Sequence, residues 1–158
     1  MVDICWKGRT MPVTVPDILQ GSMTLIGRIS LCAIFLTNAV GFNIPNFEEV
    51  VSAMGRVGIP QPRFALVLAI GILLAGSGML IVGWKSKVGA ALLLFYLTVS
   101  NMYFHNFWVI NDPVMHKLEM VQFLKNLSLM GAMLLIVANG SGPYSLDLQK
   151  SPRAKFSG

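Results

Sequence analysis

Four long runs of apolar residues, joined by short polar connections, make up most of the chain. The runs cover residues 23–42, 64–84, 88–110 and 118–138. Each is close to the roughly 20 residues that an α-helix needs to cross a hydrocarbon core of about 30 Å. The pattern therefore predicts an all-α integral membrane protein in which four transmembrane helices form a bundle.

The composition agrees with a membrane environment. The chain has 158 residues, of which 54% are hydrophobic and only 12% are charged, so it holds one domain whose expected partner is the lipid bilayer. The net charge of +5 comes from basic residues scattered over connections and tails. Because no basic stripe interleaved with aromatic residues is present, the sequence argues against nucleic-acid binding.

The distribution of basic residues predicts an orientation. Four crossings put both ends of the chain and the second connection on one side of the membrane. That side holds Lys7, Arg9, Lys85, Lys87, Lys150, Arg153 and Lys155, whereas the other side holds Arg56, Arg63 and Lys117. Because basic residues are in excess on the cytoplasmic side, we expect a multi-pass protein of the cytoplasmic (inner) membrane with both termini in the cytoplasm.

The expected organisation is an N-terminal cytoplasmic tail (1–22), a four-span membrane domain (23–139) and a C-terminal cytoplasmic tail (140–158). The tail of residues 1–22 shows no strong periodicity, and translation that starts at Met23 is an alternative that the sequence leaves open. The first apolar run has the length of a full span and no small-residue cleavage site, so we expect it to be retained rather than removed as a signal peptide.

The first outer connection predicts a short amphipathic helix. Asn46 precedes Glu49 by three residues, which is the spacing of a helix N-terminal capping pair. The apolar residues that share one face are Phe47, Val50, Val51, Met54 and Val57. Such a helix is expected to lie at the membrane interface, where it shields the end of the bundle.

Polar residues inside the spans are candidate functional residues, because they cost free energy in lipid and normally face the bundle interior. The candidate binding residues are Arg28, Asn38, Asn43, Asn101, His105, Asn106, Glu119, Gln122, Lys125 and Asn126. All but Arg28 fall in the outer half of the membrane. Arg28 lies near the inner end of its span, where its side chain is long enough to extend to the interface.

The shared depth of these residues predicts a polar pocket that opens toward the outer face. In it His105 would exchange protons, and Lys125 would hold an anion or pair with Glu119. An alternative is that His105 belongs to an interfacial aromatic belt and that the amides only join helices.

Other chemistry has no motif in the chain. The sequence lacks a paired-histidine metal spacing, a phosphate-binding glycine loop, a nucleophile elbow and a pair of histidines for a transmembrane haem. Cys5 and Cys32 form no Cys-x-x-Cys motif. We therefore expect no metal, no cofactor bound by a recognisable motif, and no identifiable catalytic residue.

From Thr24 to Asp147 the order of motifs resembles the DoxX family of small four-span membrane proteins. The matching stretches are Gly27-Arg28 to Phe35, Asn38 to Gly41, Gly58-Ile59-Pro60, the His105 end of the third span, Gln122 to Gly131, Gly140-Ser-Gly142 and Ser145-Leu-Asp147. Matched by position, the resemblance implies that the functional residues are Arg28, Asn38, His105, Lys125 and Asn126. Members of that family often have a basic residue near the exit of the first span, where this chain has Asn43. This difference weakens any assignment of an anion-binding site to that position.

The resemblance implies a membrane subunit of a redox complex, related to DoxD, the membrane partner in a thiosulfate:quinone oxidoreductase. The leading hypothesis is thus an accessory subunit that docks an oxidoreductase partner and offers a quinone or sulfur compound a polar site. There are two alternatives: a small-molecule or anion carrier, with a second copy of the chain as its expected partner, and a structural assembly factor without activity.

Overall fold

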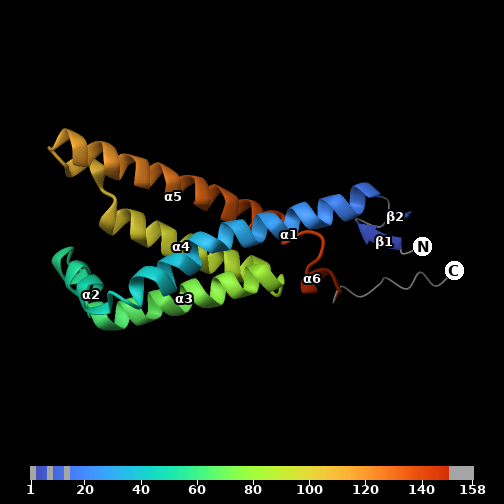
Figure 1. The fold of residues 1–158 in the computed structure, drawn as a ribbon, viewed down its shortest axis with the longest axis horizontal. Coiled ribbons are helices and arrows are strands. Elements are labelled where there is room, and N and C mark those ends of the chain that lie inside the picture. The colour runs from blue at the N-terminus through green and yellow to red at the C-terminus, as the bar shows by residue number, and fades with distance from the viewer. Residues whose placement is uncertain (1–2, 7–8, 13–14, 150–158) are drawn as a thin grey trace.

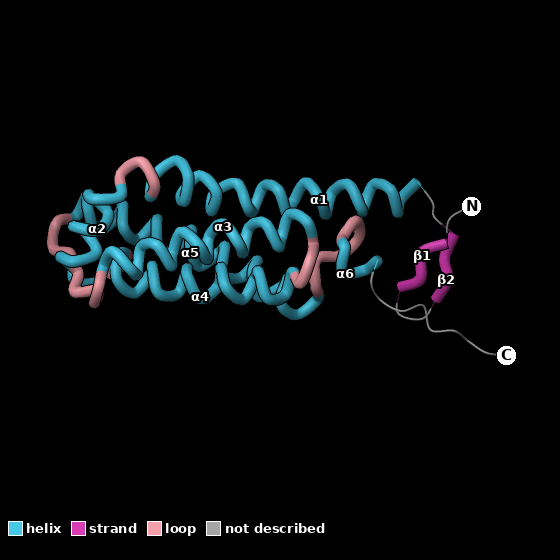
Figure 2. Tube along the Cα trace, turned by 90° about the horizontal axis from the view of Figure 1, so that it is seen from below, coloured by secondary structure: helices cyan, strands magenta, loops and turns pink. Residues whose placement is uncertain are grey.

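The computed structural model describes residues 3–6, 9–12 and 15–149. Its helices are α1 (Val15–Leu36), a π-helical continuation η1 (Thr37–Asn43), α2 (Phe47–Arg56), α3 (Pro62–Val82), α4 (Ser86–Phe104), a 3₁₀ turn η2 (Phe107–Val109), α5 (Pro113–Asn139) and α6 (Leu146–Gln149). Two short antiparallel strands, β1 (Asp3–Trp6) and β2 (Arg9–Pro12), precede them. The long helices run side by side, with α2 at one end and α6 at the other (Figures 1 and 2).

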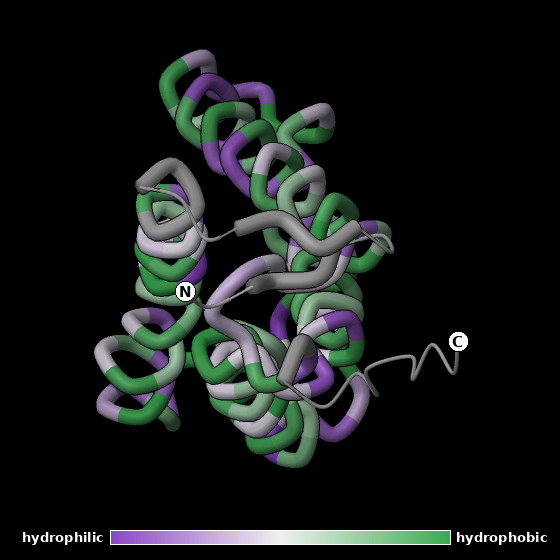
Figure 3. The backbone as a smooth tube through the Cα atoms, turned by 90° about the vertical axis from the view of Figure 1, so that its right-hand side faces the viewer, coloured by the Kyte–Doolittle hydropathy of each residue, from purple (hydrophilic) through white to green (hydrophobic). Residues whose placement is uncertain are grey.

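Four helical segments are long and apolar enough to cross a membrane. They are Leu19–Asn43, Pro62–Val82, Ser86–Val109 and Pro113–Asn139. Large apolar side chains on the outside of these segments are exposed, as Ile26, Phe64 and Leu135 illustrate, and hydrophobic residues recur along all the long helices (Figure 3). A water-exposed surface of this kind would be strongly unfavourable. The chain is therefore a multi-pass membrane protein in contact with lipid, and the predicted all-α four-helix fold is confirmed.

The start of the chain differs from the prediction. Helix α1 begins at Val15 rather than near residue 23, and Pro16 lies in its first turn, where a missing backbone N–H is tolerated. Strands β1 and β2 pair from Asp3 with Pro12 to Trp6 with Arg9, although residues 1–22 gave no periodic signal. Neither strand, DICW or RTMP, alternates apolar and polar residues, so the sequence gives no strand signal there.

The helices pack in the order α1, α3, α4, α5, and α2 packs on α3. Helices α3 and α4 approach each other closely at two glycines. A Cβ atom on Gly76 would lie 2.8 Å from Leu93 Cγ, and one on Gly89 would lie 2.9 Å from the Gly76 carbonyl oxygen. Small residues allow backbones to approach in this way in membranes. Helices α1 and α5 share no extended interface, so the bundle forms an arc that is open on one side.

The segment after α5 folds back onto the α6 end of the bundle. Asp147 accepts hydrogen bonds from the backbone nitrogens of Lys85 (2.7 Å) and Ser86 (2.9 Å) and from Ser86 Oγ (2.6 Å). The cap residue Lys85 supplies no side-chain cap of its own. Asp147 therefore caps the first turn of α4 from a distant part of the chain.

Helix α2 has the predicted apolar face, but its start differs from the prediction. Phe47, Val50 and Val51 are half-buried and Met54 is buried, whereas Val57 remains exposed. Asn46 precedes the helix without capping it; its amide nitrogen donates to the Phe42 carbonyl oxygen at 3.0 Å instead. The capping pair of Asn46 with Glu49 was therefore a wrong prediction, because the bond to Phe42 turns the Asn46 side chain back toward the preceding π-helix.

Candidate functional site

A cavity of about 630 Å³ lies at the α2 end of the bundle. All four spans and α2 contribute to its wall, and α2 supplies Val50 and Met54. The volume falls within the range of roughly 300–1,000 Å³ that is typical of small-molecule sites. The amphipathic helix predicted to shield the bundle therefore covers the end of this cavity.

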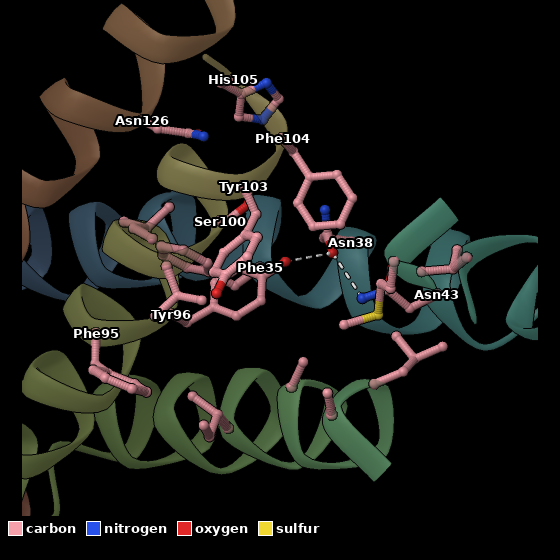
Figure 4. A pocket seen from close by; sticks show the side chains of 18 of the residues that line it. Phe35, Asn38, Asn43, Phe95, Tyr96, Ser100, Tyr103, Phe104, His105 and Asn126 are labelled. Atoms are coloured by element: carbon pink, nitrogen blue, oxygen red, sulfur yellow. Dashed lines mark hydrogen bonds between the residues drawn. The ribbon is translucent and has the colours of Figure 1, made fainter. Parts of the chain in front are cut away.

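The π-helix η1 shapes one side of the cavity. Asn43 Nδ2 donates to Asn38 Oδ1 at 3.0 Å, and the Tyr96 hydroxyl donates to the same oxygen at 3.3 Å (Figure 4). A π-helix stacks residues five apart, whereas in an α-helix such residues point in different directions. The local change of helix type therefore brings both asparagines onto the cavity wall.

Helices α4 and α5 meet through a second pair of amides. Asn126 Nδ2 donates to Asn101 Oδ1 at 2.8 Å, and Asn101 Nδ2 donates to the Phe123 carbonyl oxygen at 3.5 Å. Both side chains are buried. This pair joins helices, as the alternative interpretation expected, while Asn126 also reaches the cavity (Figure 4).

Charged groups occupy the rim of the cavity on the α5 side. His105 Nδ1 lies 2.7 Å from Glu119 Oε2. Lys125 Nζ donates to Gln122 Oε1, so the expected pairing of Lys125 with Glu119 was wrong. Glu119 lies about 1.7 turns nearer the start of α5 at 3.6 residues per turn, where His105 at the end of α4 is its partner. Lys125 has no carboxylate partner among the described residues.

An aromatic cluster lies next to this rim. Phe107 makes edge-on contacts with Trp108, His116 and Phe123 at centroid distances of 5.2–5.4 Å. His105 makes none of the ring contacts found in the described part of the chain. The cluster is placed as an interfacial aromatic belt would be, but it includes His116 rather than His105.

The structure brings most of the candidate residues together. The cavity is lined by Asn38, Asn43, His105, Gln122, Lys125 and Asn126. Of the others, Asn101 and Glu119 contact lining residues through the hydrogen bonds above, whereas Asn106 precedes η2 outside the wall.

Arg28 lies outside the cavity, in the half of the bundle nearer α6. It is only 3% exposed, and its guanidinium donates to the carbonyl oxygens of Tyr144 (2.7 Å), Pro143 (3.4 Å) and Leu80 (3.5 Å). The guanidinium thus reaches the segment that follows the fourth span, which supplies two of its three acceptors. Arg28 therefore holds that segment in place.

Some polar residues of the cavity were missed from the sequence. Tyr96, Ser100 and Tyr103 line the wall, each within an apolar run. Their spacing of four and three residues places them on one face of α4. This spacing is the sequence signal that would have identified the three residues as part of the polar wall.

The described part of the chain contains no group of three or more His, Cys, Asp or Glu side chains that could hold a metal ion. The groups at the cavity are amides, hydroxyls, one ammonium group without a carboxylate partner, and an imidazole paired with a carboxylate. These groups can bind and orient a ligand.

Comparison with known proteins identifies the family. The sequence profile of the SURF4 family matches residues 14–152. The chain is 29% identical over 126 residues to the Escherichia coli inner membrane protein YphA, covering 79% of this chain and 88% of YphA. It is 27% identical over 150 residues to the Drosophila melanogaster surfeit locus protein 4 homolog, covering 91% of this chain but 48% of that protein.

A third relative is the ER-derived vesicles protein ERV29 of Saccharomyces cerevisiae, which is 32% identical over 87 residues, 55% of this chain and 26% of ERV29. The chain thus spans about half, or less, of the length of the two eukaryotic relatives. No solved structure matches the chain.

These matches show that the assignment to the DoxX family was wrong. The redox function, which was drawn from that assignment, was wrong as well. The stretches that carried the resemblance are short and rich in glycine and small polar residues. Such residues recur wherever transmembrane helices pack closely, so they do not distinguish one four-span family from another. The quinone and the oxidoreductase partner subunit lose their support with that family.

Proposed function

The chain belongs to the SURF4 family, and we propose that it is a non-catalytic membrane protein that binds a ligand in the cavity at the α2 end, as a carrier does. The observation that supports this proposal is the cavity itself, about 630 Å³ in volume and lined by polar groups from three of the four spans. The name of the yeast relative refers to vesicles and not to a reaction, which agrees with a role outside catalysis.

The proposal includes a location and an orientation. We place the protein in the cytoplasmic membrane, on the support of its likeness to a bacterial inner membrane protein. The excess of basic residues in the two tails and the second connection of the sequence supports an orientation with both termini in the cytoplasm and the cavity near the outer surface. A reporter enzyme that is active only outside the cytoplasm, fused after residue 158, should be inactive. An active fusion would reverse the orientation.

Filling the cavity tests the proposed function without knowledge of the ligand. Ala69 of α3 lines the cavity, whereas Ala75 of the same helix is exposed on the lipid side and outside it. The Ala69→Trp and Ala75→Trp variants add the same side chain at the two positions. Wild-type protein and both variants would be isolated from their own membrane in nanodiscs and analysed by native mass spectrometry.

We expect a small-molecule adduct on the wild-type protein and on Ala75→Trp, and little or none on Ala69→Trp. Equal adducts on all three proteins, or none on the wild type, would contradict a ligand site in the cavity. In that case a structural assembly role would be favoured. The same spectra report the oligomeric state, for which a homo-oligomer remains a prediction.

A further inference from the structure

Along the first, third and fourth spans most polar side chains of the cavity wall lie nearer the α2 end, whereas α2 and α3 contribute only apolar side chains. Toward the α2 end the wall carries Asn43, His105 and Gln122. Farther from α2 it carries Ile34 on α1, Ala69 on α3 and Leu129 on α5, with Phe95 on α4 well away from His105 (Figure 4). A ligand that matches this wall has a polar head at the α2 end and an apolar body that extends toward the bilayer centre.

The charge of the wall specifies the head group. Lys125 is the only Lys or Arg among the lining residues, and no Asp or Glu is among them. Lys125 lies about 18 Å along α5 from its first residue at ~1.5 Å per residue. Helical side chains point toward the N-terminus of their helix, so the ammonium group is directed toward the α2 end, as its hydrogen bond to Gln122 shows. It lies in the half of α5 nearer α2, has no carboxylate partner among the described residues, and is available to an anionic head group.

The cavity is open at membrane depth. The lining side chains of Ile34, Tyr103 and Phe95 remain 37%, 40% and 60% exposed, although all three lie within spans. Helices α1 and α5 share no extended interface that would close the arc. A molecule dissolved in the bilayer thus reaches the cavity from the side, without passing through water.

We infer that the ligand is an amphiphile with a single apolar chain and an anionic head group, such as a long-chain carboxylate, taken up from the outer half of the bilayer. This inference rests on the proposed function and specifies the ligand class of the same site. The cavity volume suits one chain of small-molecule size. Lys125 binds the head group, and its hydrogen-bond partner Gln122 lies beside it on the cavity wall.

Palmitate, hexadecanol and acetate test the anionic head group and the apolar chain of the ligand separately. Their binding to the protein in nanodiscs of neutral phosphatidylcholine would be measured by native mass spectrometry. We expect palmitate to bind at least about tenfold more tightly than hexadecanol, since a hydrogen bond to a charged group contributes roughly 1.5–3 kcal/mol. Acetate should not bind, because it lacks the apolar chain.

Variants of two lysines on α5 supply the matched control. Lys125→Gln should reduce palmitate binding to the level of hexadecanol and leave hexadecanol unchanged, while Lys125→Arg keeps the preference. Lys117, which is exposed and outside the cavity, should give no change as Lys117→Gln. A palmitate preference that survives in Lys125→Gln would overturn the inference, as would acetate binding equal to that of palmitate.

The two proposals fail in different ways. If native adducts disappear in Ala69→Trp but palmitate binds no better than hexadecanol to the wild type, the carrier function stands and the ligand class is wrong. If Ala69→Trp changes neither the native adducts nor palmitate binding, both proposals are wrong.

Discussion

Replacing Asp147 tests how the C-terminal segment closes the α6 end of the bundle. Its carboxylate accepts three hydrogen bonds at the start of α4, with lengths of 2.6–2.9 Å. A lost helix cap costs about 0.5–2 kcal/mol, and removal of a negative charge from a helix N-terminus costs about 0.3–1 kcal/mol more. Because the site is only partly buried, water replaces some of the lost bonds. We expect Asp147→Ala to lower the free energy of unfolding by about 2 kcal/mol.

The assay is thermal unfolding of the protein in a mild detergent, followed by circular dichroism. At about 2–4 °C per kcal/mol for a chain of this size, Tm should fall by roughly 4–8 °C. Asp147→Asn keeps one acceptor oxygen and loses the charge, so its Tm should lie between those of Asp147→Ala and wild type. Glu49, an exposed acid on α2, is the control, and Glu49→Ala should change Tm by less than about 2 °C. A Tm for Asp147→Ala equal to that of Glu49→Ala would refute the assignment of Asp147 as a cap.

Three further predictions concern helix packing and surface charge. Gly76→Leu should lower stability by about 1–3 kcal/mol or more, because its side chain would enter the α4 backbone; unchanged thermal unfolding would contradict the close crossing of α3 and α4. A double-mutant cycle of Asn101→Ala and Asn126→Ala should give a coupling energy of about 0.6–2 kcal/mol, and additive effects would show that the amide pair is not formed. The exposed ion pair between Arg63 and Glu48 should contribute less than about 1 kcal/mol, so Arg63→Ala should leave unfolding nearly unchanged, and a loss above 2 kcal/mol would indicate a buried role.

The four spans were predictable because each depends only on the length of an apolar run. The same holds for the apolar face of α2, whose 3.6-residue spacing is visible in the sequence. The common depth of the polar residues also predicted that Asn38, His105 and Asn126 lie near one another, since depth follows from position along each span.

The features that were predicted wrongly or missed depend on contacts between segments that are distant in the sequence. No local pattern shows that residues 140–147 return to the bundle, so the acceptors of Arg28 and the capping role of Asp147 were not predictable. The π-helix that pairs Asn38 with Asn43 is likewise a departure from the helical period on which sequence reasoning relies. The family was assigned wrongly because glycine-rich stretches report helix packing rather than ancestry.

The central claim is that the cavity at the α2 end holds the ligand, and photolabelling tests it most directly. Protein in nanodiscs would be exposed to a fatty acid that carries a diazirine on its chain, irradiated and digested, and the labelled residues would be identified by mass spectrometry. We expect label on cavity residues of α4 and α5 such as Phe95 and Leu129, suppressed by excess palmitate and by Ala69→Trp. Label spread evenly over lipid-facing residues such as Ile26 and Leu135, unaffected by either, would contradict it.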